Sequence, residues 1–195
     1  MTKISRFAIV SALMLGCSLI AFAGNVELVA NGGFETGDFS GWTLGGNCGS
    51  FCNVTSTMPH SGAFSAQLGP VGSDGTLSQT LDTVAGATYT FSFWLANDAG
   101  VPNDFSAYFD GLQVLNFNNL NIPGGFPYTD FVFTVMASTD STVIQFNFRQ
   151  DPAFWFLDDV SVFGPAGNGT VPEPGSMALL GTGLVALGFA GRKLY

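Results

Sequence analysis

The sequence predicts an all-β protein, with an antiparallel β-sandwich in the middle of a chain of 195 residues. Three observations predict this fold class. Apolar and polar residues alternate through most of the central region, which is the pattern of half-buried strands. Helical periodicity is missing from the same region. Turn signals rich in Gly, Asp and Pro separate the alternating runs.

The predicted strands follow one another in short runs. In chain order, the clearest runs cover residues 64–68, 76–84, 89–96, 131–135, 143–148 and 156–162. The turn signals between them are Asp74-Gly75, Ala85-Gly86, Asp110-Gly111, Pro123-Gly124-Gly125 and Ser138-Thr139-Asp140. This spacing predicts about eight or nine strands in two packed sheets. An immunoglobulin sandwich is the competing prediction, but its Cys…Trp…Cys core spacing is not present.

The N-terminal 23 residues have the pattern of a secretory signal peptide. Lys3 and Arg6 precede a nearly uninterrupted apolar stretch over residues 7–22. Ala21-Phe22-Ala23 matches a small-x-small cleavage site, so we expect residues 1–23 to be removed and the mature chain to begin at Gly24. The alternative is an N-terminal membrane anchor, for which the apolar stretch is short.

The C-terminal residues predict a single transmembrane helix. Residues 176–191 contain no charge and are followed by Arg192 and Lys193. As a helix this stretch would be roughly 24 Å long, slightly less than a hydrocarbon core. The basic pair would stay on the cytoplasmic side. A buried C-terminal helix is the alternative, although the stretch has no polar face. Residues 164–170 are rich in Gly and predict a flexible linker between the domain, residues 24–163, and this tail.

The tail, residues 171–195, resembles the PEP-CTERM sorting signals of Gram-negative bacteria. The resemblance rests on Val171-Pro172-Glu173-Pro174, the Gly-rich apolar segment and the terminal Arg192-Lys193 pair. It implies handling by an exosortase-like membrane protease, with the protein held in the membrane by its C-terminal helix before processing. It also implies a final place in the cell envelope, at the cell surface or in a secreted polysaccharide matrix. The two prolines would keep the motif extended, in a form that a protease can grip.

The charged residues and cysteines narrow the functional classes. Arg149 is the only basic residue between the two targeting segments, whereas all acidic residues of the chain except Glu173 lie there. This balance excludes nucleic acid as a partner. Cys48 and Cys52 lie in a Gly-rich segment of an exported domain, which predicts a disulfide bond. A zinc site is the alternative, but His60 is the only histidine available to complete it.

The middle of the chain resembles galactose-binding-domain-like jelly rolls, including the carbohydrate-binding modules of bacterial xylanases and glucanases. The matching segments, in family order, are Asn31-Gly32-Gly33-Phe34-Glu35-Thr36-Gly37, Ser40-Gly41-Trp42, His60-Ser61-Gly62, Tyr89-Thr90-Phe91-Ser92-Phe93-Trp94 and Phe156-Leu157-Asp158-Asp159-Val160-Ser161-Val162. The resemblance implies a jelly-roll topology and one structural calcium ion. The calcium ligands would be the carboxylates of Glu35 and Asp158, with backbone carbonyls near Gly33 and Ser61. The alternative is that both carboxylates cap turns by accepting backbone N–H bonds.

The alternation also bears on Asp158 itself. Asp158 has the same parity as Val160 and Val162, so we expect it to point toward the core unless the strand is bulged. A buried carboxylate without a partner is costly, and a calcium ion would neutralise it.

No catalytic motif stands out, and we expect a protein that is not an enzyme. No carboxylate pair is marked for glycoside hydrolysis, and His60 lies in a turn without a nucleophile motif. Sugar binding is the leading specific hypothesis. It would use Trp94 and Tyr108 as stacking platforms, because both alternate with core-facing residues, and hydrogen bonds from Asn97 and Gln145. Packing on the sheet face is the alternative role of Trp94. A structural or adhesive matrix protein without a small ligand is the second functional hypothesis.

Overall fold

The computed structural model describes residues 24–167, which form two antiparallel sheets packed face to face. The described chain contains eleven strands and no helix, so none of its elements could cross a membrane as a helix. The predicted signal peptide and the predicted helix over residues 176–191 lie outside the described residues. The all-β prediction and the two-sheet sandwich are confirmed.

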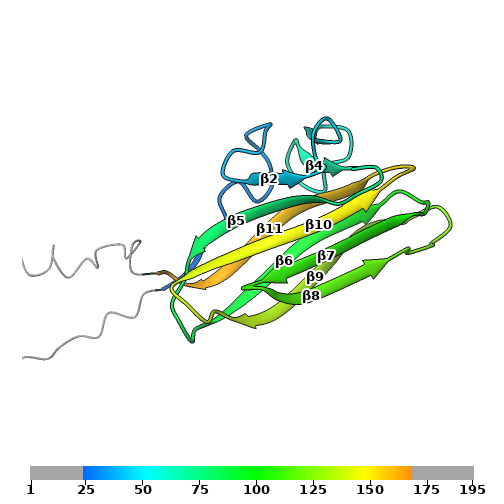
Figure 1. Ribbon diagram of the computed structural model, residues 1–195. Coiled ribbons are helices and arrows are strands. Elements are labelled where there is room, and N and C mark those ends of the chain that lie inside the picture. The colour runs from blue at the N-terminus through cyan, green and yellow to red at the C-terminus, as the bar shows by residue number, and fades with distance from the viewer. Residues whose placement is uncertain (1–23, 168–195) are drawn as a thin grey trace, which may run out of the picture.

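The six-stranded sheet has the order β3-β4-β11-β6-β9, with β1 pairing on part of β11. Its strands are β1 (Asn25–Glu27), β3 (Cys52–Thr55), β4 (Ser65–Leu68), β6 (Thr88–Asn97), β9 (Phe126–Met136) and β11 (Trp155–Pro165). The five-stranded sheet has the order β2-β5-β10-β7-β8. Its strands are β2 (Thr43–Gly46), β5 (Gly75–Asp82), β7 (Asn103–Phe109), β8 (Leu112–Asn118) and β10 (Ser141–Gln150). Figure 1 shows β5, β10, β7 and β8 as one layer and β11, β6 and β9 as the other.

The core between the sheets is formed mainly by the alternating aromatic residues. Phe91, Phe93, Phe105, Phe146 and Trp155 are each fully buried. Phe93 contacts Phe146 edge to face, with 5.1 Å between the ring centroids, so the central strands of the two sheets meet through these rings. Such edge-to-face pairs add about 0.5–1.5 kcal/mol beyond the burial of their area.

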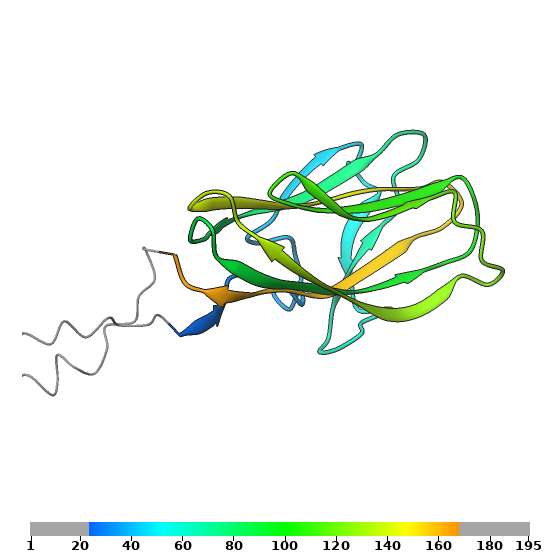
Figure 2. The same cartoon turned by 90° about the horizontal axis from the view of Figure 1, so that it is seen from below.

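The two ends of the described chain lie together at one end of the sandwich (Figure 2). Asn25 pairs with Pro165, and Val26 pairs with Gly164. The last strand therefore continues two residues past the predicted end of the domain at residue 163. The first and last residues of the described chain consequently lie at the same end of the domain.

The predicted disulfide bond is present between Cys48 and Cys52, which both lie in the hydrophobic core cluster. The bond joins the turn before β3 to its first residue. Because it closes a ring of only a few residues, its contribution to stability is on the order of 2 kcal/mol in the chain-entropy model.

A bulge in β11 changes where Asp158 points. The register of β11 against β6 shifts between Asp158 and Ser161, and Asp159 has a φ of 47°. Asp158 is directly opposite Trp94, on the outer face of the sheet, whereas Val162 is opposite the core residue Phe91. Asp158 is nevertheless fully buried, because residues 58–64 cover it. We expected Asp158 to point toward the core unless the strand is bulged. The strand is bulged, so this exception applies and Asp158 lies on the outer face.

Candidate functional site

The outer face of the five-stranded sheet is lined by short polar side chains. The strand register places hydroxyl and amide groups from four neighbouring strands on this one face. These residues are Thr76, Ser78 and Thr80 of β5, Gln145 and Asn147 of β10, Ser106 and Tyr108 of β7, and Gln113 and Asn116 of β8. Their opposite faces carry the core residues, so strand alternation alone directs these groups outward. The surface offers many hydrogen-bond donors and acceptors that are held on a rigid sheet.

Tyr108 and Gln145 are brought together at one end of this face. They are paired directly across β7 and β10. With Gly111 and Val143 they line a hollow of about 320 Å³. The side-chain amide of Gln113 donates to the Tyr108 hydroxyl at 3.2 Å, and the Gln145 amide donates to the Asn147 side-chain oxygen at 2.6 Å. The hollow therefore combines one aromatic ring with oriented amides, a combination typical of ligand sites.

The other end of the same face carries the charged groups. Arg149 donates from Nε to Oδ1 of Asp151 at 2.6 Å and from Nη2 to Oδ2 at 2.7 Å. Asp104 is directly opposite Arg149 in the register of β7 and β10. Burial, with a further contribution from the negative charge of Asp74, raises the pKa of Asp104 to about 6. The single cation of the described chain is thus already paired within an acidic group of residues.

The predicted sugar-contacting residues do not form one site. Trp94 lies on the outer face of the six-stranded sheet, so the sandwich separates it from Tyr108 and Gln145. Asn97 is only 5 % exposed, and its Nδ2 atom has no hydrogen-bond partner in the described part of the chain. Asn97 is opposite Trp155, which faces the core. Alternation correctly separated Trp94 and Tyr108 from the core, but it could not show that they belong to different sheets.

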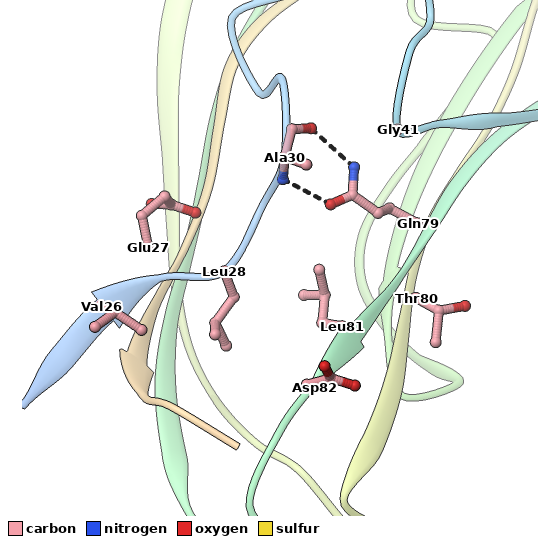
Figure 3. A pocket seen from close by; sticks show the side chains of 9 residues that line it. All are labelled: Val26, Glu27, Leu28, Ala30, Gly41, Gln79, Thr80, Leu81 and Asp82. Atoms are coloured by element: carbon pink, nitrogen blue, oxygen red, sulfur yellow. Dashed lines mark hydrogen bonds between the residues drawn. The ribbon is translucent and has the colours of Figure 1, made fainter. Parts of the chain in front are cut away.

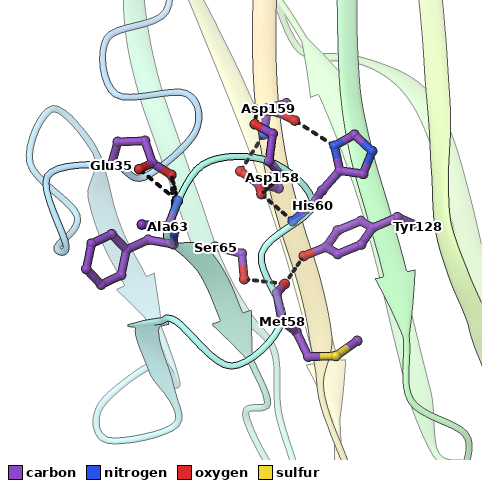
Figure 4. A network of polar contacts seen from close by, with 10 residues as sticks. Glu35, Met58, His60, Ala63, Ser65, Tyr128, Asp158 and Asp159 are labelled. Carbon is purple, nitrogen blue, oxygen red and sulfur yellow. Dashed lines mark hydrogen bonds and ion pairs between the residues drawn. The ribbon is translucent and has the colours of Figure 1, made fainter.

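Trp94 is covered by the loop of residues 58–64, a contact that was not predicted from the sequence. The His60 imidazole stacks on the Trp94 indole, with 3.8 Å between the centroids and 15° between the planes. His60 Nδ1 is 2.7 Å from Oδ2 of Asp159. The Tyr128 hydroxyl donates to the Met58 carbonyl oxygen at 2.6 Å. Figure 4 shows the polar contacts of His60 with Asp159 and of Tyr128 with Met58, which hold this loop against the sheet. The only features of the sequence that could have indicated this contact are the single histidine and the adjacent acidic pair of residues 158 and 159.

The predicted calcium ligands converge on this same loop. Asp158 Oδ2 accepts hydrogen bonds from the backbone N–H of His60 at 2.8 Å and of Ser61 at 3.3 Å. Glu35 accepts the backbone N–H groups of Ala63 and Phe64 at 2.9 and 3.1 Å. The turn-capping interactions named as the alternative are therefore present.

Gly33 lies against the same carboxylates. A β-carbon at Gly33 would be 3.8 Å from Oδ1 of Asp158 and 3.6 Å from Cγ of Glu35. Burial raises the pKa of Asp158 to about 6, against the opposing effect of its backbone hydrogen bonds. No group of three His, Cys, Asp or Glu side chains within residues 24–167 is arranged to hold a metal ion. A calcium ion here would need backbone carbonyls in its ligand set.

A second hollow, of about 420 Å³, lies between β1 and residues 79–82 of β5, the part of that strand that β2 does not pair with (Figure 3). Two of the polar side chains that line it, Gln79 and Glu27, are already hydrogen-bonded to the backbone of the protein. Gln79 binds the backbone N–H and C=O of Ala30 at 2.7 and 2.9 Å. Glu27 accepts the backbone N–H groups of Val29 and Val162 at 2.8 and 3.0 Å. This hollow is larger than the one at Tyr108, but it lies where the two sheets meet.

The chain belongs to a carbohydrate-binding family, because the family model described as "Carbohydrate binding domain" matches residues 26–155. A second model, the PEP-CTERM protein-sorting motif, matches residues 170–193. The two resemblances that the sequence indicated are therefore confirmed. No curated protein matches the chain significantly.

Solved structures share the fold at low sequence identity. TmCBM61, solved in complex with β-1,4-galactotriose, is 19% identical with a TM-score of 0.56, over 71% of this chain and 98% of its own. The K3 cleaved adhesin domain of Lys-gingipain from Porphyromonas gingivalis W83 is 22% identical with a TM-score of 0.52, over 72% and 99% of the two chains. The Stig cyclase Fisc from Fischerella sp. TAU is 16% identical with a TM-score of 0.53, over 73% and 100%. These likenesses support the jelly-roll sandwich, and the presence of a cyclase among them means that the fold alone does not decide function.

Proposed function

We propose that this chain is an exported, non-catalytic surface protein that binds polysaccharide through the outer face of its five-stranded sheet. The observation that carries the proposal is the hollow at Tyr108 and Gln145, within a face of hydroxyl and amide groups. The Tyr108 ring would stack on a sugar ring, and the amides of Gln145 and Gln113 would bond its hydroxyls. The carbohydrate-binding family supports the ligand class.

The proposed setting follows from the sorting motif. A PEP-CTERM motif implies processing by an exosortase-type system and delivery to the cell surface. Association with the exopolysaccharide of a Gram-negative cell is the specific partnership that we propose. The excess of carboxylates over the single Arg149 favours a neutral glycan over a strongly anionic one.

Affinity electrophoresis against a panel of neutral and anionic polysaccharides tests the proposal. Retardation by at least one glycan, abolished by excess soluble oligosaccharide of the same type, is expected. Unchanged migration in every polysaccharide would contradict binding and would favour a structural or adhesive matrix protein without a small ligand.

We further propose that a structural calcium ion occupies the region between Glu35 and Asp158. Within residues 24–167, the fully buried Asp158 carboxylate has no cationic partner, and Asp159 beside it adds a second negative charge. A divalent ion would offset both, with the carbonyls of Gly33 and Ser61 as further ligands. Its role would be to hold the loop over residues 58–64 against β11, away from the proposed glycan face.

A further inference from the structure

The edge of the six-stranded sheet that β9 forms is open along its whole length. Within residues 24–167, β9 pairs with β6 alone. Proteins usually protect such edges with lysines, prolines or bulges, because the unpaired backbone groups bind other strands. β9 has no lysine and Asp130 is its only charged residue, while its Pro127 and its one register shift against β6 both lie before Thr129, at the beginning of the strand. This edge is therefore available to another strand.

The outward side chains of β9 are unusually apolar for a solvent-exposed surface. Val132 is 57% exposed and Met136 is 65% exposed. Phe163 of β11, which is 46% exposed, lies on the same outer face, because it is opposite Thr90 and Thr90 is opposite Thr134. The apolar surface thus extends from the open edge across the neighbouring strands.

We propose that two copies of this chain pair through β9, antiparallel, around a two-fold axis at Val132. This register places Val132 opposite its own copy and Asp130 opposite Thr134, so that a carboxylate meets a hydroxyl. It also places Tyr128 opposite Met136. A register centred on Asp130 would instead bring two carboxylates face to face, which is unfavourable. The sequence of β9 is therefore self-complementary about Val132.

The inner face of β9 favours the same register. An apolar hollow of about 210 Å³ lies beside β8 and β9, and its lining includes Phe117, Thr129 and Phe131. In the proposed register, Phe131 is opposite Phe133 of the second copy, and Thr129 is opposite Val135 of the second copy. The second copy would therefore bring an apolar pair to the opening of this hollow. Phe131 and Phe133, which are only partly buried in a single chain, would lose further contact with water.

The acidic character of the domain opposes this association. Residues 24–167 of each copy carry many carboxylates and a single arginine, Arg149, so the two domains repel one another over a distance. Salt screens this repulsion, with a Debye length of about 8 Å at physiological ionic strength. Pairing should consequently strengthen as salt is added, the reverse of an association held by ion pairs. The proposal does not depend on the proposed glycan function, since β9 and the Tyr108 hollow lie in different sheets.

Cysteine cross-linking of the full-length chain, purified in detergent, tests the pairing and its register together. Directly opposite residues in an antiparallel pair lie about 4.5–5.5 Å apart at Cα, within the range that a disulfide bond requires. Val132→Cys should therefore form a covalent dimer under mild oxidation, seen on non-reducing gels. Thr134→Cys is the matched control: it lies on the same strand and face, but two such residues would be about 13 Å apart. At least tenfold more dimer is expected for Val132→Cys than for Thr134→Cys.

Sedimentation in detergent provides a second measurement that needs no oxidation. Val132→Asp should raise the dissociation constant of the dimer at least tenfold. Leu112→Asp, at the exposed edge of β8, should leave the dimer intact. Both substitutions are on exposed side chains, and circular dichroism checks that each variant keeps its fold. Equal cross-linking of Val132→Cys and Thr134→Cys, or a wild-type chain that sediments as a monomer at high salt, would overturn the proposal.

Discussion

The His60 imidazole lies parallel to the Trp94 indole, with their centroids 3.8 Å apart, and this contact fastens a loop to the outer face of the six-stranded sheet. The ring that alternation singled out as a platform for sugar is thus already stacked on a ring of the protein. An added contact between His60 Nδ1 and Asp159 fixes the imidazole from its edge. The structure consequently assigns Trp94 a packing role in the free protein.

The first prediction concerns this stack. His60→Ala should lower the free energy of unfolding by about 1–2 kcal/mol, because it removes an aromatic pair and a hydrogen bond to a carboxylate. Trp94 would also become more exposed, so tryptophan emission should shift to the red. Denaturant unfolding monitored by fluorescence measures both effects.

His60→Phe is the matched variant, since it keeps the stacked ring and loses only the contact with Asp159. It should retain the emission of the wild type and lose less stability than His60→Ala. If His60→Ala left both stability and emission unchanged, the stack would have no role in holding the loop.

The second prediction concerns pH. Burial raises the pKa of Asp104 to about 6, above its usual value of 3.8. The folded state therefore holds a proton that the unfolded state releases, and stability should fall as pH rises from about 4 to about 6. Asp104→Asn should remove this part of the pH dependence. At pH 7 the variant should be more stable by about 1 kcal/mol, allowing for solvent screening of a partly exposed group, or about 2–4 °C in Tm.

Thermal melts of both proteins at a series of pH values measure this difference. The stabilisation should disappear below pH 4, where the carboxyl is protonated in both states. An advantage of the variant that is the same at every pH would show that the ionisation of Asp104 is not its cause.

The third prediction concerns calcium. A chelator should lower the melting temperature of the wild-type chain, because an ion that binds only the folded state stabilises it by mass action, by about 2.7 kcal/mol at one hundred times the dissociation constant. Asp158→Asn should be insensitive to chelator. An unchanged wild-type melting temperature would contradict the proposed ion. The carboxylates of Glu35 and Asp158 would then act only by accepting backbone hydrogen bonds.

Particular residues show what the sequence could predict of the fold. Phe91 and Phe93 alternate with polar neighbours over a long strand, so their burial follows from the period of two. The three short strands near the N-terminus, β1, β2 and β3, span only three or four residues each. An alternating pattern cannot be recognised in such short runs. For this reason about eight or nine strands were expected, whereas eleven are present.

Other residues show what the sequence could not predict of the site. Because of a bulge after Asp158, that residue lies on the opposite face from the one that alternation predicts. The residue types in β11 do not predict the bulge. Tyr108 and Gln145 are far apart in the chain, and their meeting depends on the order of strands in the sheet. Strand order depends on long-range pairing, whereas alternation reports only on one strand at a time.

We propose that glycan binds to the Tyr108 face and not to the Trp94 face. The most direct measurement is the dissociation constant, by calorimetry, of the glycan that retards the wild-type chain, compared between Tyr108→Ala and Trp94→Ala. We expect Tyr108→Ala to weaken binding at least tenfold, a loss of about 1.4 kcal/mol, and Trp94→Ala to leave the dissociation constant within about twofold of the wild type. A large loss in Trp94→Ala together with unchanged binding in Tyr108→Ala, with both variants folded, would contradict it.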